Sequence, residues 1–148
     1  MPVVYRKWII RVETFKDKVT KRERVRIAKP DVAVILPILQ DGKIVLERCY
    51  RPVIDKTIIE LPAGQIDKGE LPSAAARREL LEETGYKAKT IKLAYKSFDA
   101  PGILSSCMYT FITKNLEVLY DRCGRLFERD CNGFPKIYSK RTRYTSRR

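Results

Sequence analysis

The sequence contains no histidine and only four cysteines, and both shortages limit the chemistry that the chain can perform. No two of the cysteines form a CxxC pair; they are Cys49, Cys107, Cys123 and Cys131. Zinc sites are built mainly from histidine and closely spaced cysteine, so a zinc centre is not expected. Catalysis by a histidine side chain of this chain is excluded. We expect the cysteines to be free thiols, as they are in a cytoplasmic protein.

Long apolar runs are also missing. No stretch approaches the roughly 20 apolar residues that a membrane-spanning helix needs. The apolar residues at the amino terminus are interrupted by Arg6, Lys7 and Arg11, so this stretch does not match a signal peptide. We therefore expect a cytoplasmic protein with no membrane partner. Its 148 residues are enough for one domain with a core of its own.

Acidic residues are scarce beside basic ones, and the formal net charge is +13. A basic surface attracts polyanions such as nucleic acid, acidic membranes or phosphorylated small molecules. The excess is uneven, because residues 119–148 carry nine lysines and arginines against three acidic residues. A non-catalytic, basic nucleic-acid-binding module is therefore one hypothesis. An enzyme acting on a phosphorylated small molecule is the other.

The most informative stretch runs from Glu60 to Tyr86, ELPAGQIDKGELPSAAARRELLEETGY. It predicts a helix from about Pro72 to Thr84. Proline suits the first helical position, where no backbone donor is lost. Gly85 then ends the helix in the left-handed conformation. The residues between these limits are rich in alanine, leucine, arginine and glutamate, which are good helix formers.

Three carboxylates, those of Glu79, Glu82 and Glu83, lie late in this helix and span only about 100° of its surface. They border the core-facing stripe that contains Ala76 and Leu80. Crowded like charges repel one another and tend to raise at least one carboxyl pKa. A hard divalent cation such as Mg²⁺ would relieve this repulsion, because it prefers oxygen ligands. On spacing alone, an ordinary charged flank with i,i+4 ion pairs explains the glutamates equally well.

The surrounding residues resemble the signature of the Nudix hydrolases. The matching positions are Gly64, Glu70, Arg78-Glu79-Leu80, Glu82-Glu83 and Gly85. Tyr86 departs from the pattern, since the family usually has an aliphatic residue there. The resemblance implies an α/β fold, namely a Nudix-type α/β/α sandwich with a mixed β-sheet. It also implies metal-dependent hydrolysis of a nucleoside diphosphate linked to another moiety.

The same resemblance implies roles for individual residues. Glu79, Glu82 and Glu83 look like ligands of Mg²⁺ or Mn²⁺, and Glu82 and Glu83 look catalytic. The carbonyl of Ala63, aimed by the tight turn that follows it, is expected to face the same metal. Four further positions look like residues that hold the loop and helix together: Gly64, Glu70, Arg78 and Gly85.

Two other segments resemble the ADP-ribose pyrophosphatase branch of this family. They are Cys49-Tyr50-Arg51-Pro52 and Glu60-Leu61-Pro62-Ala63-Gly64, and a proline, Pro101, follows the helix near the distance usual for this branch. The implied reaction converts ADP-ribose to AMP and ribose 5-phosphate. Other nucleotide sugars, NADH and dinucleoside polyphosphates are alternatives. The implied substrate-binding residues are Arg51, Glu60, Pro101 and Gly102.

Segments of alternating or β-branched residues predict the strands around this motif. They are Trp8–Phe15, Val19–Ile27, Val32–Leu39, Ile44–Tyr50, Thr57–Leu61, Thr90–Phe98 and Met108–Thr113. The first two form an amino-terminal antiparallel hairpin. Its second strand carries Arg22, Arg24 and Arg26 on one side and Val25 and Ile27 on the other. We expect the arginines to face solvent, either simply solvated or as a wall that faces an anion.

Residues 1–118 are expected to form a single Nudix domain. The resemblance implies that the hairpin, within residues 1–28, forms a homodimer by exchange between subunits. The basic segment 119–148 departs from the family pattern, because it shows no sustained helical or strand period. Family members often draw a further glutamate from this region, and Glu128 is the first candidate for it here.

Overall fold

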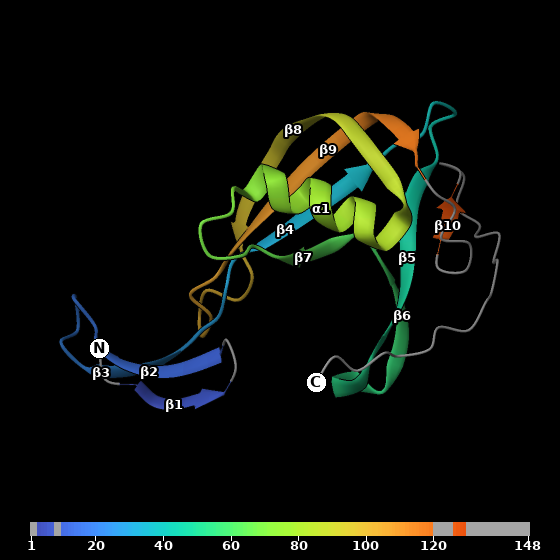
Figure 1. Ribbon diagram of the computed structural model, residues 1–148. Coiled ribbons are helices and arrows are strands. Elements are labelled where there is room, and N and C mark those ends of the chain that lie inside the picture. The colour runs from blue at the N-terminus through green and yellow to red at the C-terminus, as the bar shows by residue number, and fades with distance from the viewer. Residues whose placement is uncertain (1–2, 8–9, 120–125, 130–148) are drawn as a thin grey trace.

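A computed structural model describes residues 3–7, 10–119 and 126–129. These residues form three β-sheets and one α-helix, and the sheet at the amino terminus projects away from the rest (Figure 1). In the part of the chain that is described, no helix is both long and apolar enough to cross a membrane.

The central sheet is mixed, with the strand order β7-β4-β9-β8. Its strands are β7 (Ala63–Gln65), β4 (Val32–Pro37), β9 (Cys107–Val118) and β8 (Tyr86–Phe98). β4 pairs in parallel with β9, whereas the other two pairings are antiparallel. The helix α1 (Pro72–Thr84) lies across one face of this sheet (Figure 1). The α/β class and the mixed sheet expected from the sequence are confirmed.

The core lies between α1 and this sheet. Ile35 of β4 and Leu80 of α1 are completely buried, and Phe111 of β9 packs with them. Ala75 and Ala76 are completely buried as well, and their small side chains let the helix approach the strands closely. This packing fixes which side of α1 faces inward, and so it fixes where the glutamates at the end of the helix can lie.

A second sheet has the strand order β10-β5-β6. β5 (Ile44–Arg51) and β6 (Lys56–Glu60) are joined by a short 3₁₀ helix, Pro52–Ile54, and β10 (Leu126–Arg129) pairs antiparallel with β5. The segment after Val118 shows no sustained strand period in sequence, yet these four residues form a strand. So short a strand shows no period of its own, and its partner strand supplies the backbone hydrogen bonds. Glu128 stands opposite Val45 in this pairing, and the remainder of 120–148 lies outside the described residues.

The projecting sheet contains β1 (Val3–Lys7), β2 (Ile10–Lys16) and β3 (Glu23–Ala28). All its pairings are antiparallel, so the predicted hairpin is correct but gains a third strand that was not predicted.

The two faces of this projecting sheet differ from the expected arrangement. Glu13 is 7% exposed, and it accepts hydrogen bonds from Arg11 at 2.9 Å and from Arg26 at 3.0 Å. Arg24 lies 3.9 Å from Asp17, so it too has an acidic neighbour. Val25, which was expected on the covered side, is 56% exposed. The charged side is thus the more enclosed of the two, because ion pairs rather than a core cover it.

Candidate active site

The site is built at the carboxyl-terminal half of α1. The helix begins at Pro72 and ends at Thr84, as the sequence predicts. Gly85 has a φ of 78°, and its N–H donates to the carbonyl of Leu81 at 2.9 Å. Glycine adopts this left-handed conformation without the strain that a side chain would add. The helix therefore ends at Thr84, one residue after Glu83.

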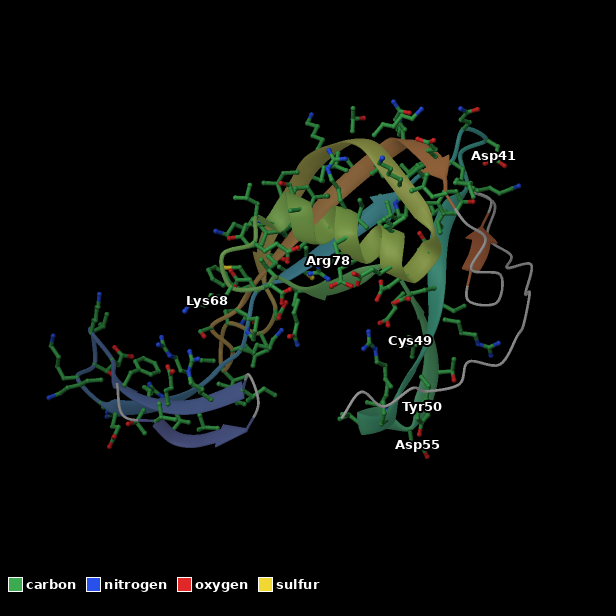
Figure 2. All side chains as sticks on the ribbon, in the orientation of Figure 1. Asp41, Cys49, Tyr50, Asp55, Lys68 and Arg78 are labelled. Carbon is green, nitrogen blue, oxygen red and sulfur yellow. The ribbon has the colours of Figure 1, made fainter. Side chains whose placement is uncertain are left out.

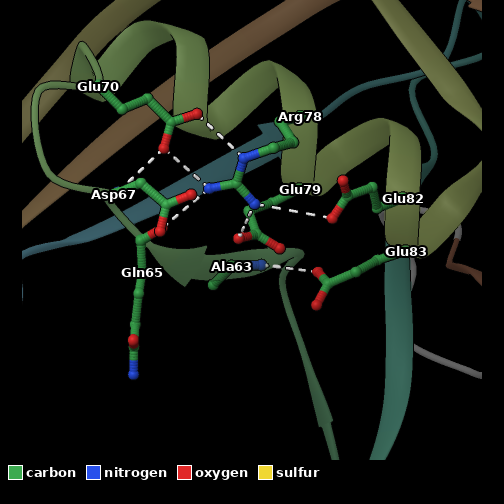
Figure 3. Close-up of polar contacts among 8 residues, drawn as sticks. All are labelled: Ala63, Gln65, Asp67, Glu70, Arg78, Glu79, Glu82 and Glu83. Atoms are coloured by element: carbon green, nitrogen blue, oxygen red, sulfur yellow. Dashed lines mark hydrogen bonds and ion pairs between the residues drawn. The ribbon is translucent and has the colours of Figure 1, made fainter. Parts of the chain in front are cut away.

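Arg78 joins the helix to the loop that precedes it (Figure 3). Its Nε donates to Glu70 Oε1 at 3.0 Å and its Nη2 to Glu70 Oε2 at 2.9 Å, which is a bidentate pair. Nη2 also donates to the carbonyl of Gln65 at 2.9 Å. Glu70 in turn accepts from the N–H of Asp67 at 3.0 Å. The bonds from Arg78 and the Asp67 N–H hold the pKa of Glu70 at about 2.

The same guanidinium also contacts two of the motif glutamates. Its Nη1 lies 2.6 Å from Glu79 Oε1 and 3.6 Å from Glu82 Oε2. The Glu79 side chain is 13% exposed, whereas that of Glu82 is 57% exposed. The Glu79 carboxylate lies directly against Gly64, where a Cβ atom would overlap it. A side chain at position 64 would therefore displace the Glu79 carboxylate.

Glu83 lies on the side of the helix that faces the second sheet. Its Oε2 accepts a hydrogen bond from the N–H of Ala63 at 3.0 Å (Figure 3). Burial first, and then the negative charges of Glu47, Glu79 and Glu60, raise the pKa of Glu83 to about 8, although the hydrogen bond from Ala63 acts in the opposite direction. Ala63 therefore meets the site through its N–H in this structure, whereas its carbonyl was the expected contact.

Glu47 was missed by the sequence analysis. It is 5% exposed on β5 and stands directly opposite Glu60 of β6. Acidic residues directly opposite one another in a sheet repel. The signal that could have revealed it is the alternation of β5, which places Glu47 on the same inward side as the fully buried Val45. A glutamate at an inward strand position is rarely placed there by packing alone.

The expected substrate residues fall into two groups. Arg51 and Glu60 form an ion pair between neighbouring strands, close enough to Glu83 for Glu60 to affect its pKa. Pro101 and Gly102 are exposed on the loop between β8 and β9 instead. Figure 1 shows this loop descending toward the projecting sheet, away from the glutamates of α1. The structure therefore does not gather all four residues at one point.

The carboxylates fit a hard divalent cation, because such ions prefer oxygen donors. Nearby negative charges repel the Glu83 carboxylate, and the last turn of α1 contains no basic residue that would offset this repulsion. Among the described residues, however, no three acidic or cysteine side chains converge closely enough to form a preassembled metal site. Two of the motif glutamates are turned toward Arg78 instead. A cation would have to draw their carboxylates toward Glu83.

A mixed sheet covered by one helix, with an arginine-braced acidic loop and helix, defines a domain of the Nudix type. The family profile described as the NUDIX domain matches residues 29–119. The chain belongs to the Nudix family, and its similarities place it in the ADP-ribose pyrophosphatase-like branch. The projecting sheet lies before the matched range.

The similar proteins include two from Bacillus. An ADP-ribose pyrophosphatase of Bacillus subtilis (strain 168) is 36% identical over 75% of this chain and 59% of its own length. A methanol dehydrogenase activator of Bacillus methanolicus is 35% identical over 76% of this chain and 60% of its own length. The chain thus spans about three fifths of these relatives. A crystal structure of an ADP compounds hydrolase is 27% identical, covering 86% of this chain and 72% of that one, with a TM-score of 0.67.

The ion pair between Glu70 and Arg78 should make the stability of the fold depend on pH. The pKa of Glu70 falls from 4.5 to about 2 on folding, so its stabilising effect is present above pH 4.5 and is lost as the pH falls through about 2. We expect Glu70→Gln to lower the urea midpoint at neutral pH, and the difference from wild type to shrink toward pH 2. Glu117→Gln, which removes an exposed partner 4.0 Å from Lys89, is the control and should change little. A Glu70→Gln difference that stays constant with pH would contradict the assignment.

The contact between Gly64 and Glu79 allows a test of whether Glu79 binds a cation. The three atoms nearest to a new Cβ at this position belong to the flexible end of Glu79, so Gly64→Ala should fold but displace that carboxylate. We expect the melting temperature to change little and the affinity for Mn²⁺, measured by electron paramagnetic resonance, to fall by roughly 10-fold or more. Unchanged Mn²⁺ affinity would show that Glu79 does not contribute to cation binding.

Proposed function

We propose that the chain hydrolyses the diphosphate linkage of a nucleoside diphosphate derivative, with ADP-ribose as the substrate. Water attacks one phosphorus, the bond from that phosphorus to the bridging oxygen breaks, and the products are AMP and ribose 5-phosphate. The observation that carries this proposal is the group of carboxylates at the end of α1, which occupy the glutamate positions of the Nudix motif. Arg78 pairs with Glu70 beside them, and the last turn of the helix contains no basic residue to balance their charge. The names of the relatives from Bacillus subtilis and yeast support the choice of ADP-ribose.

Glu79, Glu82 and Glu83 would hold Mg²⁺ or Mn²⁺. A divalent ion bound there neutralises phosphate oxygens and lowers the pKa of a nearby water. Glu83 is held by the Ala63 N–H and is the best positioned of the three, whereas Glu79 would have to leave Arg78 to reach the cation. Glu82 is more exposed, and it is the ligand that can turn toward an arriving cation.

Arg51 would bind the phosphates of the substrate. It is exposed at the end of β5, and its partner Glu60 orients it from the next strand. An arginine can bind two phosphate oxygens at once, and it keeps its charge at every relevant pH. Pro101 and Gly102 would contact the ribose at the other end of the substrate, on the loop between β8 and β9.

Glu83→Gln tests the enzyme hypothesis. It removes the negative charge that Glu83 would carry with a cation bound but keeps the shape of the side chain, so turnover should fall by about 100-fold or more while the fold is kept. The measurement is AMP release from ADP-ribose with saturating Mg²⁺ or Mn²⁺, compared with release in EDTA. Turnover near that of the wild type would refute the assignment of Glu83.

The same assay separates the enzyme from a nucleic-acid-binding module. An enzyme releases phosphomonoester products only when the divalent ion is present, and a panel with other nucleotide sugars, NADH and dinucleoside polyphosphates identifies its substrate. A protein that releases no product from any of them, but binds nucleic acid with strong salt dependence, would be the basic module instead.

We also infer a homodimer formed through the projecting sheet. Val25 and Ile10 of that sheet are 56% and 42% exposed, and Val53 and Ile54 at the far end of the β5–β6 ribbon are 97% and 52% exposed. Figure 2 shows this end of the ribbon beside the labels of Tyr50 and Asp55. A second copy of the chain would cover both apolar areas.

Light scattering at micromolar concentration should give the mass of two chains. Val25→Lys places a charge in the proposed interface and should shift the mass toward one chain, whereas Val19→Lys in the exposed β2–β3 turn should not. A wild-type protein that is monomeric under these conditions would rule the dimer out.

Residues 1–118 remain our proposed functional domain, with the projecting sheet as its dimer-forming part. A cytoplasmic location stays a prediction from the cysteine pattern.

A further inference from the structure

The end of β3 and the connection from β3 to β4 are bonded to the loop between β8 and β9 and to the start of β9. The N–H of Ile27 donates to the carbonyl of Ile103 at 2.8 Å, and the N–H of Ser105 donates to the carbonyl of Ile27 at 3.2 Å. A few residues along, the N–H of Cys107 donates to Asp31 Oδ1 at 2.8 Å. These bonds attach the projecting sheet to the rest of the molecule through one loop.

Two side chains strengthen this attachment at its centre. Lys29 Nζ lies 2.5 Å from Asp99 Oδ2, and the side chains are only 24% and 19% exposed. The same oxygen accepts a hydrogen bond from Ser106 Oγ at 2.9 Å, and Ser106 is 1% exposed. Burial opposes ionisation of Asp99, but the bonds from Lys29 and Ser106 outweigh it and hold the pKa of Asp99 below its usual value. The Asp99 carboxylate is therefore ionised, and it is bonded both to Lys29 and to Ser106 at the other end of the loop.

The position of this pair matters because the loop it holds, residues 99–106, carries Pro101 and Gly102. Both are exposed, and Asp99 and Ser106 are the residues that begin and end the loop. Asp99 thus joins the first residue of the loop to the last through Ser106, and to the β3–β4 connection through Lys29. These bonds restrict the shapes that the loop can adopt and couple it to the connection that leads from the projecting sheet.

We propose that Lys29 and Asp99 are positioning residues, whose ion pair clamps the loop of residues 99–106 to the β3–β4 connection and thereby sets the affinity for the nucleoside diphosphate derivative. This rests on the proposed function, because the loop acts on affinity only if it contacts the substrate. Neither residue touches the reacting atoms, so the clamp changes binding and leaves the chemical step alone.

The test compares Lys29→Met, Asp99→Asn and the double variant with wild type in steady-state hydrolysis of ADP-ribose. Loss of a charged hydrogen bond should raise KM roughly 10-fold with kcat unchanged. The double variant should be no worse than Asp99→Asn alone, because both substitutions remove the same Lys29–Asp99 interaction. Lys29→Arg keeps the charge and should restore KM. Lys43→Met is the matched control; it removes a lysine paired with Asp41 at 2.8 Å in a turn far from the loop (Figure 2).

Amide hydrogen exchange supplies a readout that needs no substrate. Breaking the clamp should speed exchange at Ile27 and Ser105 without affecting Ile35, whose N–H donates to Pro62 in the core. An unchanged KM, additive effects in the double variant, or kcat and the unfolding midpoint falling together with KM would each overturn the proposal. If the wild type released no AMP, the proposed function would fail, and the exchange rates alone would then support or overturn the clamp.

Discussion

The site depends above all on the ion pair between Arg78 and Glu70. One guanidinium binds a loop carboxylate at both oxygens, a loop carbonyl and the carboxylates of Glu79 and Glu82. A lysine could not replace it, because its ammonium is a point charge without the planar arrangement of donors. The loop from Gln65 to Glu70 has few apolar anchors of its own. This arginine therefore holds the loop against the helix, whereas the pairing of β7 with β4 places Gly64 beside Glu79.

The second constraint is electrostatic, and it opposes folding. Glu82 and Glu83 occupy the last turn of α1, where the negative end of the helix dipole disfavours carboxylates, and no basic residue stands in that turn. Glu47 adds a buried carboxylate from β5. Arg78 balances only part of this charge, and burial together with the remaining negative charges raises the pKa of Glu83. A protein selected for stability alone would not keep this arrangement, whereas binding of a divalent cation and a diphosphate explains it.

Local signals in the sequence are sufficient to predict the helix and the glutamates of the site. The bounds of α1 follow from Pro72 and Gly85, and the Nudix motif identified the glutamates before their geometry was known. Other features depend on tertiary contacts. β7 and β10 have three and four residues, too short for a period, and they form only because β4 and β5 offer free edges. The ion pair between Lys29 and Asp99 joins residues that are far apart in the chain, and no local sequence pattern predicts such a contact.

The central claim is that the carboxylates around Glu83 bind a divalent cation, and anomalous diffraction from crystals grown with Mn²⁺ tests it most directly. Our account predicts an anomalous peak between Glu79 and Glu83, with Glu82 turned away from Arg78 to join them and Arg78 still paired with Glu70. Well-ordered crystals without a peak at these side chains, or with Mn²⁺ bound only elsewhere, would contradict it.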